Sequence, residues 1–103
     1  MYARVARWEG ADAAQMREAV EAIKASGGPP EGVPAKGILV LSDPDGGRAM
    51  FVGLFETEED RRKGDETLNA MNPPAGSMGR RVAVEMYEVS LDARAAGAEP
   101  VVG

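Results

Sequence analysis

The spacing of apolar and polar positions divides the chain into short strands and helices. Residues 2–8 carry aromatic and β-branched side chains that favour a strand. Apolar residues then recur every three or four positions from Met16 to Ile23, which predicts a helix. Asp12 is suited to cap this helix in a capping box, and the GGPP that follows Ser26 cannot continue it.

Two further apolar runs, residues 35–41 and 48–55, are joined by the polar stretch SDPDGG. Pro44 pre-sets the first turn angle, and either Gly46 or Gly47 supplies a positive φ, so the sequence predicts a β-hairpin here. Both runs are nearly continuous in apolar residues, which is typical of strands that are covered on both faces.

A second helix is predicted over residues 58–71, because Thr57 is a good N-cap and Asn72 is followed by two prolines. Residues 80–91 alternate between apolar and polar positions, which indicates a strand. The order strand, helix, strand, strand, helix, strand is that of a ferredoxin-like α+β domain, βαββαβ. Such a domain has a four-stranded antiparallel sheet with both helices on one face.

We expect residues 1–91 to form this domain and residues 92–103 to form a loosely held C-terminal tail. The second sheet face would stay bare in a monomer, so we expect two copies to pair their sheets as a homodimeric α+β barrel. The 103 residues are 44% hydrophobic and only 5% aromatic, so the core is thin and burial against a partner would strengthen it.

Charge and composition exclude several classes of function. With 12 basic and 17 acidic residues the net charge is −5, and no Lys and Arg patch is dense enough to follow a phosphate backbone, so we expect no nucleic-acid partner. There is no apolar signal region and no run near the roughly 20 apolar residues of a membrane span, so a cytoplasmic location without membrane contact is expected. The absence of Cys and His excludes disulfides, thiolate catalysis, Ser-His triads and histidine-ligated haem.

The densest charged stretch is TEEDRRKGDE, at the start of the second predicted helix. Its first carboxylates lie where the helix dipole favours negative charge. The remaining charges pair at i,i+4 spacing as Glu58 with Arg62, Glu59 with Lys63, Arg61 with Asp65, and Arg62 with Glu66. The three consecutive carboxylates point in different directions on a helix, so we expect no metal site there. The run is therefore interpreted as a solvated helix face.

The inward face of the same helix is more informative. Its positions are Arg61, Gly64, Leu68 and Met71. Because Gly64 leaves this face poorly filled, we expect a cavity between the helix and the sheet. Asn69 and Asn72 could then donate hydrogen bonds to a ligand oxygen, or alternatively Asn69 is exposed and Asn72 only ends the helix.

Two aromatic residues and two arginines complete the set of candidates. Trp8 and Tyr87 are suited to stack on an aromatic ligand or to fill the core. Arg4 and Arg7 lie on opposite faces of the first strand, and we expect one of them to pair with Glu85 or Glu88. The ligand-pocket candidates are thus Trp8, Arg61, Gly64, Leu68, Asn69, Asn72, Glu85 and Tyr87, with no catalytic residue assigned.

The opening YARVARWEG, the GILVL strand, the phrase FETEED and the closing VEMYEV together resemble the dimeric α+β barrel proteins related to antibiotic biosynthesis monooxygenases. The resemblance covers residues 1 to about 91. It implies a homodimer and, in one branch of the family, oxygenation of phenols or quinols with no metal or organic cofactor. That branch uses Asn, Trp and Tyr around its substrate, and the residues of these types here are Trp8, Asn69, Asn72, Tyr2 and Tyr87. The haem-degrading branch needs a ligating His, which this chain lacks.

Two functions stay open from the sequence. The first is a cofactor-independent monooxygenase acting on a small phenolic molecule, with Glu85, Glu88 or a water held by an Asn as the base. The second is a non-catalytic dimeric domain for ligand binding or assembly.

Overall fold

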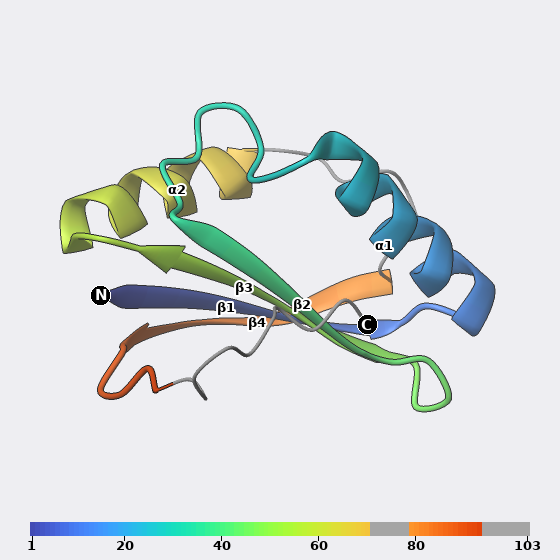
Figure 1. Ribbon diagram of the computed structural model, residues 1–103. Helices are drawn as coiled ribbons and strands as arrows, with labels where there is room; N and C mark the ends of the chain where they lie inside the picture. The colour runs from blue at the N-terminus through green and yellow to red at the C-terminus, as the bar shows by residue number, and fades with distance from the viewer. Residues whose placement is uncertain (71–78, 94–103) are drawn as a thin grey trace.

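The computed structural model describes residues 1–70 and 79–93 of the chain. The elements are β1 (Tyr2–Gly10), α1 (Ala13–Ser26), β2 (Gly37–Asp43), β3 (Arg48–Phe55), α2 (Glu58–Ala70) and β4 (Gly79–Glu88). The four strands form one antiparallel sheet in the order β2-β3-β1-β4. Both helices lie on the same side of this sheet, at opposite ends of it (Figure 1). The predicted ferredoxin-like α+β fold is therefore confirmed.

Strand pairing shifts some boundaries from their predicted positions. β1 continues past Trp8, because Glu9 and Gly10 still have partners in β4. β2 begins at Gly37 rather than two residues earlier, and β4 ends at Glu88. The end of the second helix and most of the tail predicted over residues 92–103 lie outside the described residues.

Local side-chain chemistry defines both ends of α1 as expected. The Asp12 carboxylate accepts the Gln15 N–H at 2.8 Å, and the Gln15 side chain accepts the Asp12 N–H at 3.1 Å, which completes the capping box. At the other end Gly27 takes a left-handed conformation with φ 79°, and its N–H donates to Lys24 O. These contacts fix the length of the helix at 14 residues.

The β2–β3 hairpin is held by Asp43. Its carboxylate accepts the Gly46 N–H at 3.1 Å and Arg48 Nε at 2.9 Å. These contacts, the hydrogen bond from Arg48 first, lower the pKa of Asp43. Gly47 supplies the positive φ, at 66°, so of the two glycines considered for this role it is the later one that fills it.

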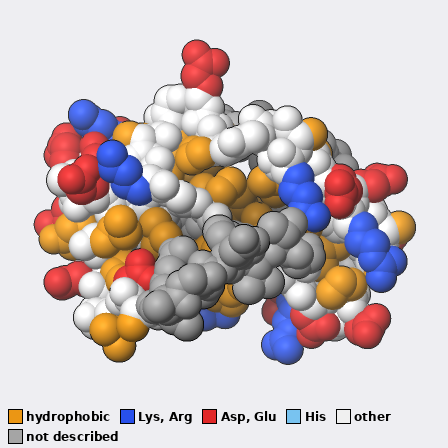
Figure 2. All heavy atoms as spheres, in the orientation of Figure 1, with side chains coloured by type: hydrophobic (Ala, Val, Ile, Leu, Met, Phe, Trp, Pro, Cys, Tyr) orange, Lys and Arg blue, Asp and Glu red, His pale blue; other side chains and the backbone are white. Residues whose placement is uncertain are grey.

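The two helices cover two separate parts of the sheet. Under α1 the buried cluster is Ala11, Met16, Ala19 and Ala49, with Trp8 packed against it. Under α2 the main buried side chain is Phe55, which lies against Gly64. Figure 2 shows hydrophobic side chains between the two helices and charged side chains gathered toward both ends of the molecule.

On the opposite sheet face, which we call the open face, none of the described residues forms a helix (Figure 1). Register partners point to the same face, so Val5, Val52 and Leu39 form one row across the strands, and Arg7, Met50 and Leu41 form the next. Large apolar side chains on this face are about half exposed, namely Leu39 (48%), Leu41 (51%), Val82 (42%) and Tyr87 (47%). The exposed apolar side chains expected on this face are thus present among the described residues.

Candidate ligand pocket on the open sheet face

The charged run that begins α2 caps and solvates the helix. Thr57 Oγ1 accepts the Asp60 N–H at 3.0 Å, which confirms the predicted N-cap. Arg62 contacts both Glu66 at 2.8 Å, as predicted, and Glu59 at 2.6 Å. The nearest cation to Glu58 is Arg61, at 3.7 Å, so the predicted Glu58–Arg62 pair is wrong. The predicted Arg61–Asp65 pair is also wrong, because the Asp65 carboxylate is paired with Arg4 of β1 instead.

Arg4 of β1, the partner of Asp65, has a side chain that is only 3% exposed. Arg4 Nε donates to Asp65 at 2.8 Å, and Arg4 Nη2 donates to Asn69 Oδ1 at 3.1 Å. Arg81 Nη1 donates to the same oxygen at 2.8 Å. Asn69 is thus a structural acceptor between β1, β4 and α2, and its carbonyl oxygen is occupied by protein donors.

The cavity expected beneath Gly64 is absent. A Cβ placed on Gly64 would lie 2.5 Å from Phe55 Cε1 and 2.7 Å from Phe55 Cζ, so the Phe55 ring occupies the space. Gly64 allows this close approach of helix and ring. The expectation of a cavity is therefore wrong, because Gly64 makes room for the Phe55 ring and leaves no empty space.

The other candidates on α2 also lie on the helix side of the sheet. Arg61 Nη1 donates to Tyr87 O at 2.9 Å, and the guanidinium lies 5.2 Å from the centre of the Tyr2 ring. Leu68 is half-buried in the same helix. Asn72 lies outside the described residues. Arg61 therefore links α2 to the strands β4 and β1.

On the open face, Arg7, Glu85 and Tyr87 form a hydrogen-bonded chain. Arg7 Nε donates to Glu85 Oε1 at 2.5 Å, and the Tyr87 hydroxyl donates to Glu85 Oε2 at 3.0 Å. The expected pairing of one β1 arginine with Glu85 is confirmed. The hydrogen bond from Arg7, and after it the one from Tyr87, holds the pKa of Glu85 below its ordinary value.

Replacing Arg7 by glutamine is expected to move the pKa of Glu85 back up toward its ordinary value, because the larger of the two stabilising hydrogen bonds is lost. Carboxyl NMR titration measures this directly, with Arg62→Gln on α2 as a control that leaves Glu85 unchanged. In the wild type the stabilisation from this pair is present above the unfolded-state pKa of Glu85 and is lost as pH falls through the folded-state pKa. A wild-type Glu85 that titrates at its ordinary pKa would contradict the contact.

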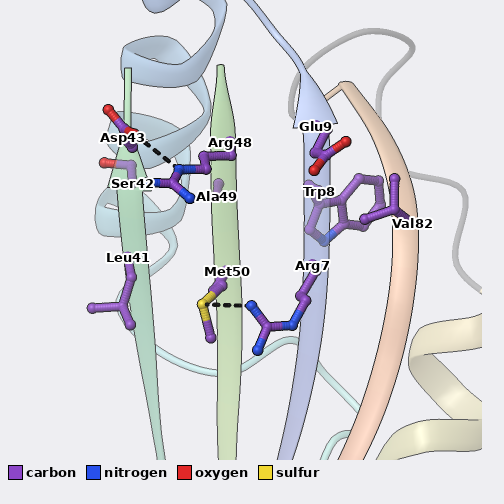
Figure 3. Close-up of a pocket in the computed structure, with 10 residues that line it drawn as sticks. All are labelled: Arg7, Trp8, Glu9, Leu41, Ser42, Asp43, Arg48, Ala49, Met50 and Val82. Carbon is purple, nitrogen blue, oxygen red and sulfur yellow. Dashed lines mark hydrogen bonds and ion pairs between the residues drawn. The ribbon is translucent and has the colours of Figure 1, made fainter. Parts of the chain in front are cut away.

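Beside the hydrogen-bonded residues Arg7, Glu85 and Tyr87 lies a pocket of about 390 Å³ (Figure 3). It is lined by Arg7, Trp8, Glu9, Leu41, Ser42, Asp43, Arg48, Ala49, Met50 and Val82. The volume falls within the range of about 300 to 1,000 Å³ that is typical of small-molecule sites. Its walls are mostly apolar, and its charged groups stand at the strand ends and along one side.

A β-bulge shapes one wall of the pocket. In the β1–β4 pairing Arg7 lies opposite Ala83, whereas Trp8 lies opposite Arg81, so Val82 is the extra residue. Trp8 packs against the core under α1, and both Trp8 and Val82 are among the residues that line the pocket (Figure 3). The bulged segment of β4 therefore forms part of the pocket wall.

Of the candidates taken from the sequence, only Trp8 lines this pocket. Glu85 and Tyr87 stand next to it through Arg7, while Arg61, Gly64, Leu68 and Asn69 are on the other side of the sheet. Leu41, Met50 and Val82 were not expected as site residues. The continuous apolar content of β2 and β3 was the signal available for Leu41 and Met50, and the alternating pattern of β4 gave none for Val82.

Within residues 1–70 and 79–93 no group of three or more His, Cys, Asp or Glu side chains is placed to hold a metal ion. The helices in these ranges are too short and too polar for any of them to cross a membrane. Comparison of the chain with protein-family models gives no match, and no curated protein sequence matches it.

Proposed function

We propose that this protein functions as a homodimer in which the open faces of two copies meet, and that the pocket on that face binds a small aromatic molecule. The observation that carries the proposal is the half-exposed apolar surface of Leu39, Leu41, Val82 and Tyr87 on a face without a helix. Exposed apolar side chains on one face are typical of an interface.

The open face is suited to contact a copy of itself. A two-fold axis places the same surface on both sides of the contact, so like charges on it would repel. Here Arg7 is paired with Glu85, and Arg48 is paired with Asp43 at 2.9 Å. Because these cations are paired, they would not repel their counterparts across a two-fold contact. Full burial of one Leu side chain would stabilise such a dimer by about 1.5 to 3 kcal/mol.

The pocket supports the ligand half of the proposal. Trp8, Leu41, Met50 and Val82 offer flat or flexible apolar contacts to a ring. The pocket borders the row of Arg7, Met50 and Leu41 on the open face, so a second copy would also cover its mouth and exclude water. A dimer thereby converts an open hollow into an enclosed site.

This assembly is that of the dimeric α+β barrel proteins related to antibiotic biosynthesis monooxygenases, and we propose membership of that group. The order of the elements and the side of the sheet on which the helices lie support the assignment.

We expect Leu39→Lys to weaken dimerisation at least tenfold, because it puts an unpaired charge among the apolar side chains of the contact. Leu39 does not line the pocket, so the change tests assembly alone. Sedimentation equilibrium gives the dissociation constant. Ala22→Lys, which adds the same charge at an exposed position of α1, is the control and should leave that constant unchanged. Equal constants for Leu39→Lys and the wild type would place the contact elsewhere.

A second candidate function is cofactor-independent oxygenation of a bound phenol. The Tyr87–Glu85–Arg7 chain beside the pocket favours it, since it supplies an ionised carboxylate next to a guanidinium. The lowered pKa makes Glu85 a weak base, so activation of a phenol would depend on Arg7 stabilising its anion.

Oxygen uptake with a panel of anthrones and quinols tests this second candidate. The expected result is uptake above the buffer rate that falls at least tenfold in Arg7→Gln, because the variant removes the stabilising cation. Arg62→Gln, on the outer face of α2, should retain the rate. Uptake at the buffer rate for every compound would leave ligand binding by a non-catalytic dimer as the function.

A further inference from the structure

The guanidinium of Arg7 has one edge that faces the pocket without a strong acceptor. Its Nε is taken up by Glu85, but within the described part of the chain the acceptor nearest to Nη1 is the Met50 thioether, at 3.5 Å. Figure 3 shows this edge directed from β1 toward β3 across the pocket. A thioether sulfur is a weak acceptor, so this N–H gains from a negatively charged oxygen in its place.

The other charges around the pocket determine where an anion can lie. Arg48 is engaged by the Asp43 carboxylate, so it offers less free charge. Glu9 is the register partner of Arg48 and lies one position beyond Trp8 on β1. The carboxylates of Asp43 and Glu9 therefore both stand at the hairpin end of the pocket, two residues along the strands from the Arg7–Met50 pair. Glu85 lies on the far side of the Arg7 guanidinium, where it is bonded to Nε and to the Tyr87 hydroxyl.

We propose that the pocket selects an apolar organic anion, with one carboxylate or phenolate oxygen held by Arg7 Nη1 and the ring against Trp8, Leu41 and Val82. This inference rests on the proposed ligand-binding function and adds the charge of the ligand and the residue that reads it. Met50 moves aside when the oxygen arrives, which its unbranched side chain permits.

The geometry also explains why the anion is organic. Arg7 supplies a single free edge, and Arg48 is engaged by Asp43. An inorganic anion would therefore meet one free cation and lose its hydration along the walls formed by Leu41, Met50 and Val82. A ligand with one charged oxygen and a hydrophobic body satisfies both parts of the pocket. The carboxylates at the hairpin end disfavour a second negative group on the same molecule.

Titration calorimetry with 2-naphthoate and its neutral amide, 2-naphthamide, tests the inference. We expect naphthoate to bind about tenfold more tightly, because the charged oxygen makes a charge-assisted hydrogen bond that the amide cannot match. Arg7→Gln should remove this difference by weakening naphthoate alone, and Arg7→Lys should keep part of it. Glu9→Gln should strengthen naphthoate binding, since a like charge is removed.

A phenolate is tested in parallel with 4-nitrophenol, whose absorbance reports its ionisation. Binding to the wild type should lower the apparent pKa of 4-nitrophenol, and binding to Arg7→Gln should not. Comparing the affinities of 4-nitrophenol and 2-naphthoate shows whether the pocket prefers a phenolate or a carboxylate. Light scattering on each variant verifies that its dimer is intact. Arg62→Gln on α2 is the control and should bind both probes as the wild type does.

Equal affinities for naphthoate and naphthamide, or a preference that survives in Arg7→Gln, would overturn the assignment of Arg7 while leaving the pocket as a ligand site. Failure of both compounds to bind would overturn the ligand half of the proposed function and this inference together. The two failures are therefore distinguishable in one set of titrations.

Discussion

Replacing Phe55 by alanine is expected to lower the free energy of unfolding by about 3 to 5 kcal/mol, because the ring is fully buried and a cavity would remain beneath α2. Such a loss is a large share of the total stability of a domain of this size. Urea unfolding followed by circular dichroism measures it. Leu91→Ala is the matched control, because Leu91 is 82% exposed and its truncation should change the unfolding free energy by less than about 0.5 kcal/mol.

The fit between Phe55 and Gly64 adds a second, more specific expectation. Gly64→Ala should destabilise in the wild type, because its Cβ would meet the ring at 2.5 Å and overpacking outweighs the gain of about 1 kcal/mol in helix propensity. In a Phe55→Leu background the same change should be neutral or stabilising. Additive effects in this double-mutant cycle would show that ring and helix are not in contact.

Replacing Arg4 by methionine is expected to cost about 3 kcal/mol of unfolding free energy, because it removes the partner of Asp65 from a buried contact. Asn69 would also lose one of its two arginine donors. Chemical unfolding of the variant measures the loss. Arg4→Lys should recover little, since a single ammonium lacks the two edges that reach Asp65 and Asn69 together.

The double variant Arg4→Met with Asp65→Leu tests whether the loss comes from an uncompensated charge. It should recover most of the wild-type stability, because apolar groups of similar size replace the pair. If the double variant is as unstable as the sum of the single variants, the contribution of Arg4 lies in its packing and not in its ion pair.

The fold could be predicted because its elements are defined by local chemistry. The capping box at Asp12, the left-handed Gly27 and the Asp43 turn each act within a few residues, and each is present in the structure. The pairing of Arg7 with Glu85 was also accessible, since strand alternation limits which side chains share a face. These features require no knowledge of contacts made at long range beyond the order of the strands.

The cavity under Gly64 could not be judged correctly in this way. A helical glycine looks the same in a sequence whether it faces a void or a ring, and the ring belongs to Phe55 on a preceding strand. The Arg4–Asp65 contact spans 61 positions and displaces an i,i+4 pair that spacing alone had favoured. Long-range packing overruled local spacing at both places.

The proposed pocket could not be located from the sequence for a related reason. Its walls come from three neighbouring strands and from a β-bulge at Val82, which has no signature in the alternating pattern of its strand. The apolar strands led us to expect a partner on the open face, but they did not indicate that a hollow lies at one end of it. We therefore expect the functional residues of this protein on the open face and not beneath α2.

The molar mass of the protein in solution tests the central claim most directly. Light scattering coupled to size exclusion, at micromolar concentration, should give about 22 kDa, twice the 10.8 kDa of one chain, if the open faces of two copies meet. The same mass should fall toward that of one chain in Leu39→Lys. A wild-type mass of 10.8 kDa across that concentration range would contradict the claim.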